Sequence, residues 1–278
     1  MASLTPQQTR QLEETARQLR VESLRMISRR GAGHAGGALS AAEILSVLYF
    51  HTLRIDPARP TWEARDRLVL SKGHASAALY AALAQRGFFP LAELDRWGEV
   101  DCPHQGHPDR LKTPGVDMTS GLLGHGVAIG AGMALAARLR QVEYRVFVVL
   151  GDGECQAGVV WEGAAVAAKY HLGNLIAVVD NNGVQLDGPV RDVMPLEPLG
   201  PRWAAWGWRV LEVDGHDVDA LAEAFASTTP ARSQPTAIIA HTVKGKGVSF
   251  MENNHIWHGA VPTPEQLRRA LAELGEGD

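Results

Sequence analysis

Four short, mainly apolar runs recur in the second half of the chain and limit its possible folds more than any other feature. They cover residues 146–150, 175–179, 209–213 and 236–240. Segments with helical apolar spacing separate them, at about 159–170, 202–206 and 218–227. Strands of this kind that alternate with helices are typical of a parallel sheet covered on both faces. We therefore predict an α/β fold in which helices cover both faces of a parallel sheet.

The first half of the chain is expected to be mainly helical. The segment Thr5-Pro6-Gln7-Gln8 combines an N-cap residue, a first-turn proline and a capping-box glutamine, so a long helix should begin here and end at Gly31. Apolar spacing predicts further helices at residues 40–53, 75–85, 127–139 and 264–274, and a short strand at 67–70. Residues 96–120 contain several prolines and glycines and have no steady period. We expect a long ordered loop there, and such loops are usually functional.

Size and composition limit the organisation of the chain and its partners. With 278 residues, 45% of them hydrophobic, and no internal repeat or linker, the chain is expected to form a single domain over residues 1–278. A net charge of −4 offers no basic surface for a nucleic acid, and no apolar run approaches the ~20 residues that span a bilayer. Two cysteines are too few for a disulfide framework. We predict no nucleic-acid or membrane partner and a cytoplasmic location.

Polar residues follow two consecutive strands of the predicted sheet. Gly-Asp-Gly occupies residues 151–153 and Asp-Asn-Asn occupies residues 180–182. Ligands of open parallel sheets bind beyond the carboxyl ends of the strands, so the side chains of Asp152 and Asn182 could converge on one cation. A carboxylate, an amide oxygen and a nearby carbonyl suit Mg²⁺ or Ca²⁺, with phosphate oxygens completing the shell. The glycines beside Asp152 would let a diphosphate approach the backbone.

A plainer interpretation is that Asp152 and Asn182 only cap the helices and turns that follow them, which such residues commonly do. The pair at the ends of two consecutive strands favours a ligand site over two unrelated caps. The chain has no Walker phosphate loop, and no Gly-x-Gly-x-x-Gly follows the first strand, so the common nucleotide-binding loops do not compete with this interpretation.

Gly-Asp-Gly followed at this interval by Asn-Asn resembles the thiamine-diphosphate signature, and nearly the whole chain resembles the N-terminal domain of transketolase. The matching segments are Gly33-His34, residues 70–76, Gly106-His107-Pro108 with Pro114-Gly115-Val116, residues 121–124 and Trp257-His258-Gly259-Ala260. Residues 242–248, followed by Phe250-Met251-Glu252, are similar to the separately encoded N-terminal transketolase subunits in particular.

The resemblance assigns expected roles to individual residues. Side chains of Asp152 and Asn182 and the carbonyl of Val184 would bind the metal, which is expected to be Mg²⁺, with Ca²⁺ or Mn²⁺ as alternatives. Residues expected to contact the thiamine diphosphate, besides Asp152 and Asn182, are His74, Gly121, Leu122, Leu123, Gly153, Lys244 and His258. Catalytic or substrate-facing roles are expected for His34, His107 and His258, of which His34 and His107 would hydrogen-bond ketose hydroxyls.

The implied activity is transfer of a two-carbon ketol unit from a ketose, or its phosphate, to an aldose. Thiamine diphosphate would act as the electron sink, and imidazoles suit the accompanying proton transfers near neutral pH. In this family the carboxylate that activates the cofactor lies in a second, pyrimidine-binding domain, which the chain lacks. The resemblance therefore implies a C-terminal partner subunit with that domain, with two copies of each subunit.

Three features depart from the family pattern. Ala157 stands where the family often has a glutamate, although Glu162 is present; His125 replaces a glutamine; and residues 102–105 have an unfamiliar form. Two alternatives stay open. An α subunit of a 2-oxo acid dehydrogenase would share the diphosphate motif but would not be expected to place histidines at 34, 74, 107 and 258. A non-catalytic diphosphate-binding or scaffolding subunit is favoured only by the incomplete site and by Ala157.

The remaining histidines are not expected to be catalytic as a group. A lone histidine is more often a structural or surface residue, and we expect this for His51, His171 and His216. The four that match the family lie in glycine-flanked, loop-like contexts, where functional side chains concentrate. The sequence leaves His104, His125, His241 and His255 undecided.

Overall fold

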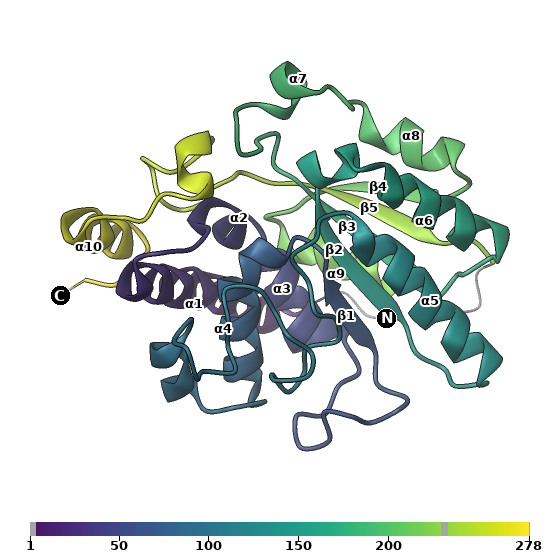
Figure 1. The fold of residues 1–278 in the computed structure, drawn as a ribbon, viewed down its shortest axis with the longest axis horizontal. Coiled ribbons are helices and arrows are strands. Elements are labelled where there is room, and N and C mark those ends of the chain that lie inside the picture. Colours follow the sequence, from purple (N-terminus) through teal and green to yellow (C-terminus); the bar gives the residue numbers. More distant parts are fainter. Residues whose placement is uncertain (1–3, 229–232, 278) are drawn as a thin grey trace.

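The chain is built around a parallel sheet of five strands in the order β1-β2-β3-β5-β4 (Figure 1). The computed structural model describes residues 4–228 and 233–277. The strands are β1 (Arg67–Leu70), β2 (Val146–Gly151), β3 (Leu175–Asn181), β4 (Arg209–Asp214) and β5 (Thr236–His241). All neighbouring strands pair in parallel. This confirms the predicted α/β fold.

Both faces of the sheet are covered by helices because successive strand residues point to opposite faces. Phe147 and Val149 of β2 join a core with α1 (Pro6–Arg30), α3 (Ala42–Val47), α4 (Ser76–Arg86) and α9 (Val218–Ala226). The alternate residues Val146, Val148 and Leu150 join a second core with α5 (His125–Leu139), α6 (Gly158–Lys169) and α8 (Leu199–Ala205). Figure 1 shows these two helical layers on either side of the sheet.

The remaining elements are short, apart from the last helix. They are α2 (Ala35–Ser40), the π-helical turn η1 (Leu48–Thr52), α7 (Val190–Val193) and α10 (Pro264–Glu273), with 3₁₀ turns η2 (Gly73–Ala75), η3 (Leu91–Arg96), η4 (Gly153–Gln156) and η5 (His255–His258). No helix within the described residues is long and apolar enough to cross a membrane. Residues 97–124 form the predicted long loop, without helix or strand.

The strands that bear the polar motifs end together. Gly151 at the end of β2 pairs with Asp180 of β3, and Asn181 at the end of β3 pairs with His241 of β5. β2 and β3 extend one and two residues beyond the predicted apolar runs because the polar residues at their ends still join the ladder. Asp152, Asn182 and Thr242 therefore leave the sheet at neighbouring points of one edge.

The start of the second helical segment was predicted wrongly. The sequence indicated residue 40, whereas α2 begins at Ala35 and includes two buried glycines. A Cβ on Gly36 would lie 2.9 Å from the Lys244 side chain, and one on Gly37 would lie 3.3 Å from Lys72 Nζ. The helix penalty of glycine is outweighed here by packing against two buried lysines. By contrast, the capping box that begins α1 at Thr5 is confirmed.

Candidate active site

Four histidines from four segments meet above the carboxyl edge of the sheet. His34 directly precedes α2, His74 lies in η2, His107 lies in the long loop and His258 ends η5. The ring centres of His34 lie 5.2 Å from His74, 5.4 Å from His258 and 6.4 Å from His107, and those of His74 and His258 are 4.9 Å apart. The structure thus brings together the four histidines that the sequence singled out.

Burial keeps three of these imidazoles neutral. Desolvation and the nearby Lys72 charge hold the pKa of His74 well below its usual value. Desolvation and the Lys244 charge lower the pKa of His258 to about 3, and desolvation with the His107 charge lowers the pKa of His34. A neutral imidazole has one donor and one acceptor nitrogen; His258 Nδ1 already accepts from Lys244 Nζ at 2.8 Å, which leaves Nε2 of that ring as a donor for a sugar hydroxyl.

Beside the histidines lies a cavity of about 230 Å³ at the ends of β2 and β3. Its walls include seven of the predicted cofactor residues, namely His74, Leu123, Asp152, Gly153, Asn182, Lys244 and His258, together with Val184. Gly121 and Leu122 are not part of the wall, and Leu122 is largely exposed. Gly121 has a φ of +144°, and a Cβ there would lie 3.3 Å from the His107 ring, so this glycine lets the loop pass close to His107.

Asp152 and Asn182 both point into the turn that follows β3. Asp152 accepts hydrogen bonds from the backbone N–H of Gly153 (2.8 Å) and of Gly183 (2.6 Å), and Asn182 Oδ1 accepts from the N–H of Val184 (3.1 Å). Burial and the neighbouring Asp180 carboxylate raise the pKa of Asp152 to about 6. Within the described part of the chain, no ion pair neutralises Asp152. A buried carboxylate in this state fits a bound cation.

The Val184 carbonyl already receives a positive charge. Lys244 Nζ donates to this carbonyl at 2.9 Å and lies 2.8 Å from Nδ1 of His258. Burial and the Lys72 charge lower the pKa of Lys244 to about 8. The ammonium lies beside the carbonyl that the resemblance names as a metal ligand, so this carbonyl already faces a cationic group. The hard oxygen donors therefore fit a divalent metal with a diphosphate.

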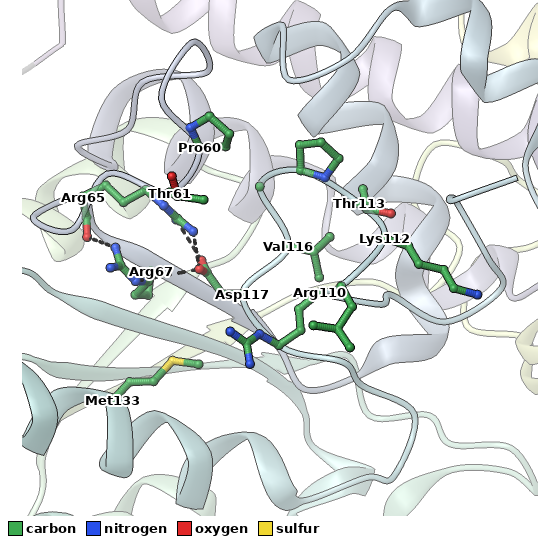
Figure 2. A pocket seen from close by; sticks show the side chains of 13 residues that line it. Pro60, Thr61, Arg65, Arg67, Arg110, Lys112, Thr113, Val116, Asp117 and Met133 are labelled. Atoms are coloured by element: carbon green, nitrogen blue, oxygen red, sulfur yellow. Dashed lines mark hydrogen bonds and ion pairs between the residues drawn. The ribbon is translucent and has the colours of Figure 1, made fainter.

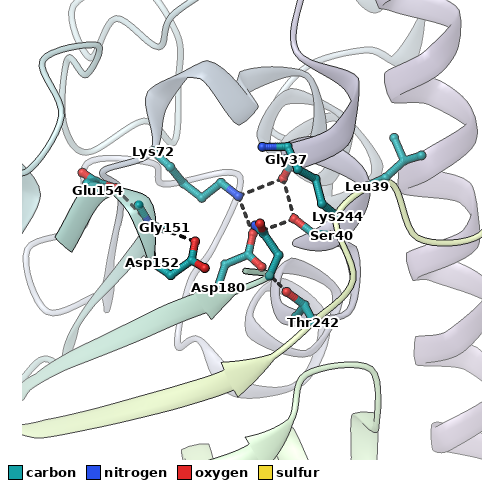
Figure 3. A network of polar contacts seen from close by, with 12 residues as sticks. Gly37, Leu39, Ser40, Lys72, Gly151, Asp152, Glu154, Asp180, Thr242 and Lys244 are labelled. Carbon is teal, nitrogen blue, oxygen red and sulfur yellow. Dashed lines mark hydrogen bonds and ion pairs between the residues drawn. The ribbon is translucent and has the colours of Figure 1, made fainter. Parts of the chain in front are cut away.

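A buried ion pair between Lys72 and Asp180 lies beside the cavity, which Lys72 lines; Figure 3 shows its network of polar contacts. Lys72 Nζ bonds to Asp180 and to the carbonyl of Gly37 (3.0 Å). Asp180 also accepts from Ser40 (2.6 Å) and from Thr242. These contacts join α2, β3 and the segment after β5, so the ion pair fixes the relative positions of three elements around the cavity. Sequence reasoning did not assign Lys72 or Asp180 a role.

Glu154 is a third residue beside the site to which the sequence analysis assigned no role. Its buried carboxylate accepts hydrogen bonds from the Ser71 hydroxyl, from Gly124 N–H (2.7 Å) and from Gly151 N–H (3.0 Å). It thus attaches the glycine turn before α5 to the ends of β1 and β2. The available signal was a glutamate directly after Gly-Asp-Gly, in a stretch that the strand pattern places at the buried edge.

The three departures have different structural contexts. Ala157 packs against the glycine turn, since a Cβ on Gly124 would lie 2.8 Å from its methyl group. His125 lies at the start of α5, and its Nδ1 is 3.2 Å from the Leu123 carbonyl. In residues 102–105, His104 is buried, stacks on Phe89 with ring centres 4.0 Å apart and lies 3.0 Å from Glu93 Oε2.

Two other histidines also have structural surroundings. His216 lies 2.9 Å from Glu43 Oε2 and accepts the N–H of Val243 at 2.8 Å. His241 lies 3.1 Å from Glu212 Oε2 on the surface. These contacts account for both side chains without a catalytic role, as the sequence suggested for His216.

The fold and the strand-end site define a thiamine-diphosphate-binding domain. Residues 11–276 match the family described as "Transketolase, thiamine diphosphate binding domain". The chain belongs to the transketolase family. This confirms the resemblance seen in the sequence, including its thiamine-diphosphate-binding character.

Relatives that are themselves separate subunits match this chain nearly end to end. It is 42% identical to the 6-deoxy-6-sulfo-D-fructose transketolase subunit of Clostridium sp. (strain MSTE9), over 95% of this chain and 96% of the relative. It is 39% identical to one subunit of the apulose-4-phosphate transketolase of Phocaeicola vulgatus, over 97% of this chain and 95% of that relative. The prediction of a subunit of the two-subunit transketolase type is thereby confirmed.

Longer transketolases contain this fold as one part. The structure of transketolase from Campylobacter jejuni superposes with a TM-score of 0.89 at 35% identity, covering 95% of this chain and 42% of that protein. The chain thus spans about two fifths of this solved transketolase.

Proposed function

We propose that this chain and a pyrimidine-binding partner subunit together transfer a two-carbon ketol unit from a ketose to an aldose. This proposal depends on one observation: four histidines meet beside a cavity that Asp152, Asn182 and Val184 line at the ends of two strands. Thiamine diphosphate supplies the electron sink when bound. Both cysteines are free and buried, which is consistent with the cytoplasmic location we propose.

Different residues of the chain would bind the metal ion and the diphosphate. Asp152, Asn182 and the Val184 carbonyl would hold Mg²⁺, and Ca²⁺ or Mn²⁺ would suit the same oxygen donors. Gly153 would admit the diphosphate, since a Cβ there would occupy space 3.0 Å from Gln185 and 3.8 Å from Val190 that the glycine leaves open. Lys244 would exchange part of its contact with the Val184 carbonyl for a diphosphate oxygen, which the ammonium binds more strongly than a neutral carbonyl.

The histidines would contact the sugar hydroxyls and take part in proton transfer. His34 and His107 would orient ketose hydroxyls, while His258, already bonded to Lys244, would hold or return a proton near the diphosphate. The names of the two split relatives specify ketoses that bear a sulfonate or a phosphate. We therefore propose a ketose with an anionic end, whose basic contacts would come from the partner subunit in an assembly with two copies of each chain.

Reconstitution tests this proposal directly. The chain, its pyrimidine-domain partner, Mg²⁺ and thiamine diphosphate are mixed with phosphorylated, sulfonated and unsubstituted ketoses plus an aldose, and product aldose and ketose are measured. We expect transfer only when both subunits are present. Asp152→Ala should abolish it with an unchanged circular dichroism spectrum, and Asp101→Ala, at an exposed aspartate, should not. Full activity of Asp152→Ala would refute the metal site, and activity of the chain alone would refute the need for a partner.

A further inference from the structure

A basic pocket lies at the free edge of the sheet, away from the cofactor cavity. It has a volume of about 550 Å³ and is lined by residues near the start of β1, by residues 110–117 of the long loop and by Met133 of α5. None of its lining residues lines the cavity at the strand ends. β1 is an outer strand of the sheet, and Asp117 covers its edge by accepting the N–H of Leu68 at 2.9 Å.

The pocket has a strong excess of positive charge. Arg65, Arg67, Arg110 and Lys112 line it, and Asp117 is its only acidic lining residue. Figure 2 shows the Arg65 and Arg67 guanidinium groups on the same side of the pocket, both beside Asp117. One carboxylate cannot balance this set, so an anion that entered the pocket would be attracted by the remaining charge.

Two of the arginines are held in place before any ligand binds. Arg65 is only 7% exposed, both of its Nη atoms bond to Asp117, and its Nε is buried without a hydrogen-bond partner. The Arg67 guanidinium lies over the Tyr144 ring, 4.5 Å from its centre, and donates to the carbonyls of Arg65 and Glu63. Because these groups are already ordered, an anion would lose little side-chain entropy on binding them.

Arg110 is the exposed arginine of the pocket. Across the part of the chain that the structure describes, its backbone N–H bonds to Thr119 but its guanidinium makes no hydrogen bond or ion pair. In Figure 2 this guanidinium extends toward the side that Arg67 and Met133 line, whereas the Lys112 ammonium extends the other way. The Arg110 donors are therefore free to meet a ligand.

We propose that this pocket binds the phosphate group of a small phosphorylated molecule. The planar donor fork of arginine matches phosphate oxygens; the Arg110 guanidinium can bind them directly, while Arg65 and Arg67 add positive charge beside it. The volume falls within the range of small-molecule sites, about 300–1,000 Å³, and exceeds what a free phosphate needs. The ligand would also contact the loop that holds His107, because residues 110–117 of that loop line the pocket. The Ser120 N–H donates to the Pro108 carbonyl at 3.1 Å and closes the loop.

Titration calorimetry on the full chain, at constant ionic strength, tests the site with inorganic phosphate and with glycerol 3-phosphate. We expect a single site that binds the ester at least as tightly as phosphate. Arg110→Ala should weaken binding about tenfold or more, and Arg110→Lys should weaken it less, because the bidentate guanidinium fork is lost in both but the charge only in the first. Arg268→Ala, at an exposed arginine of α10, should bind like the wild type.

Chemical-shift mapping by NMR separates this pocket from the cofactor site. Phosphate should move the amide signals of residues 110–113 and 115–117 and leave those of Gly153 and Gly183 unchanged. The proposal is overturned if no binding is detected, if Arg110→Ala binds like the wild type, or if the shifts concentrate at Gly153 and Gly183. Weaker binding of the ester than of free phosphate would overturn the assignment of a phosphorylated molecule as the ligand. None of these outcomes depends on ketol transfer.

Discussion

Glu154 is the residue on which three segments of the site converge. Burial raises the pKa of its carboxyl, and the hydrogen bonds from Ser71, Gly124 and Gly151 oppose that rise. Three donors for one carboxylate compensate much of the cost of removing the charge from water. The side chain therefore fixes the glycine turn at residues 121–124 relative to the strand ends, although it is not among the residues expected to touch the metal.

Replacing Glu154 by glutamine should loosen this turn. The amide keeps the shape but offers one acceptor oxygen where the carboxylate offers two, so at least one buried donor loses its partner. We expect the free energy of unfolding to fall by about 1–3 kcal/mol and the affinity for thiamine diphosphate with Mg²⁺ to fall as well. Urea denaturation and calorimetry measure the two effects.

The matched control is Glu162→Gln at an exposed position of α6. It should change stability by less than about 0.5 kcal/mol. Equal stabilities of Glu154→Gln and Glu162→Gln would show that the three hydrogen bonds do not organise the turn.

Asp152 and Asn182 could be predicted because strand ends in a parallel sheet meet by topology alone. Lys72, Asp180 and Glu154 could not, since their roles depend on partners far along the chain. Lys72 and Asp180 are 108 positions apart, and Ser71 and Glu154 are 83 apart. No local pattern states which buried charges will meet. For Lys72, Asp180 and Glu154, the sequence shows only a charged residue within an apolar or glycine-rich stretch.

At the scale of elements, α3 connects the first helix to the loop that bears Lys244. Glu43 of α3 pairs with Arg20 of α1 at 2.6 Å and lies 2.9 Å from His216 Nδ1. His216 in turn accepts the N–H of Val243 through Nε2. His216 therefore carries its proton on Nδ1 and accepts through Nε2. The Glu43 carboxylate thus fixes the tautomer of His216 that binds the Val243 N–H.

The stability of this connection should depend on pH through Glu43. Burial would raise the pKa of Glu43, but the hydrogen bond of His216 and the charge of Arg20 outweigh it and hold the pKa below its usual value. A lowered pKa in the folded state means that the ionised carboxylate stabilises the protein above the ordinary glutamate pKa. That contribution is lost as the pH falls below it.

Glu43→Gln should therefore destabilise the chain by about 3 kcal/mol near neutral pH, because it leaves the Arg20 charge buried without a partner. The difference from the wild type should shrink as the pH is lowered to about 3, because the carboxyl protonates first in the unfolded chain and then, at lower pH, in the folded one. Urea denaturation at both pH values measures it. Glu99→Gln, at a half-exposed pair with Arg96, should have little effect at either. A difference for Glu43→Gln that does not change with pH would contradict this explanation.

Elements were predictable where a local signal decided them. The Thr5 capping box begins α1, and the apolar runs gave every strand to within two residues. The start of α2 was missed because Gly36 and Gly37 pack against Lys244 and Lys72, which come from distant parts of the chain. Helical spacing within the segment carries no information about such contacts. The short α7 was also missed, since four residues are too few to show a period.

For the whole molecule, exposed apolar side chains surround the opening of the cofactor cavity. Leu123 and Leu186 line the cavity and are 42% and 57% exposed, and nearby Leu122 and Ile256 are 70% and 60% exposed. Scattered apolar residues on a surface need no explanation, but a cluster around a binding site is typical of a surface that another protein covers. The partner subunit, which would supply the pyrimidine-binding side of the site, fits that position.

Charged substitutions at this rim should block assembly and leave the chain folded. We expect Leu186→Asp and Ile256→Asp each to weaken association with the partner about tenfold or more, because a charge would be buried at the interface without a counterion. Leu91→Asp, at an equally exposed leucine of η3, is the control and should associate like the wild type. Analytical ultracentrifugation of the mixed subunits gives the association constants. If both rim variants assemble normally, the partner does not cover this face and the cofactor cavity must be completed from another direction.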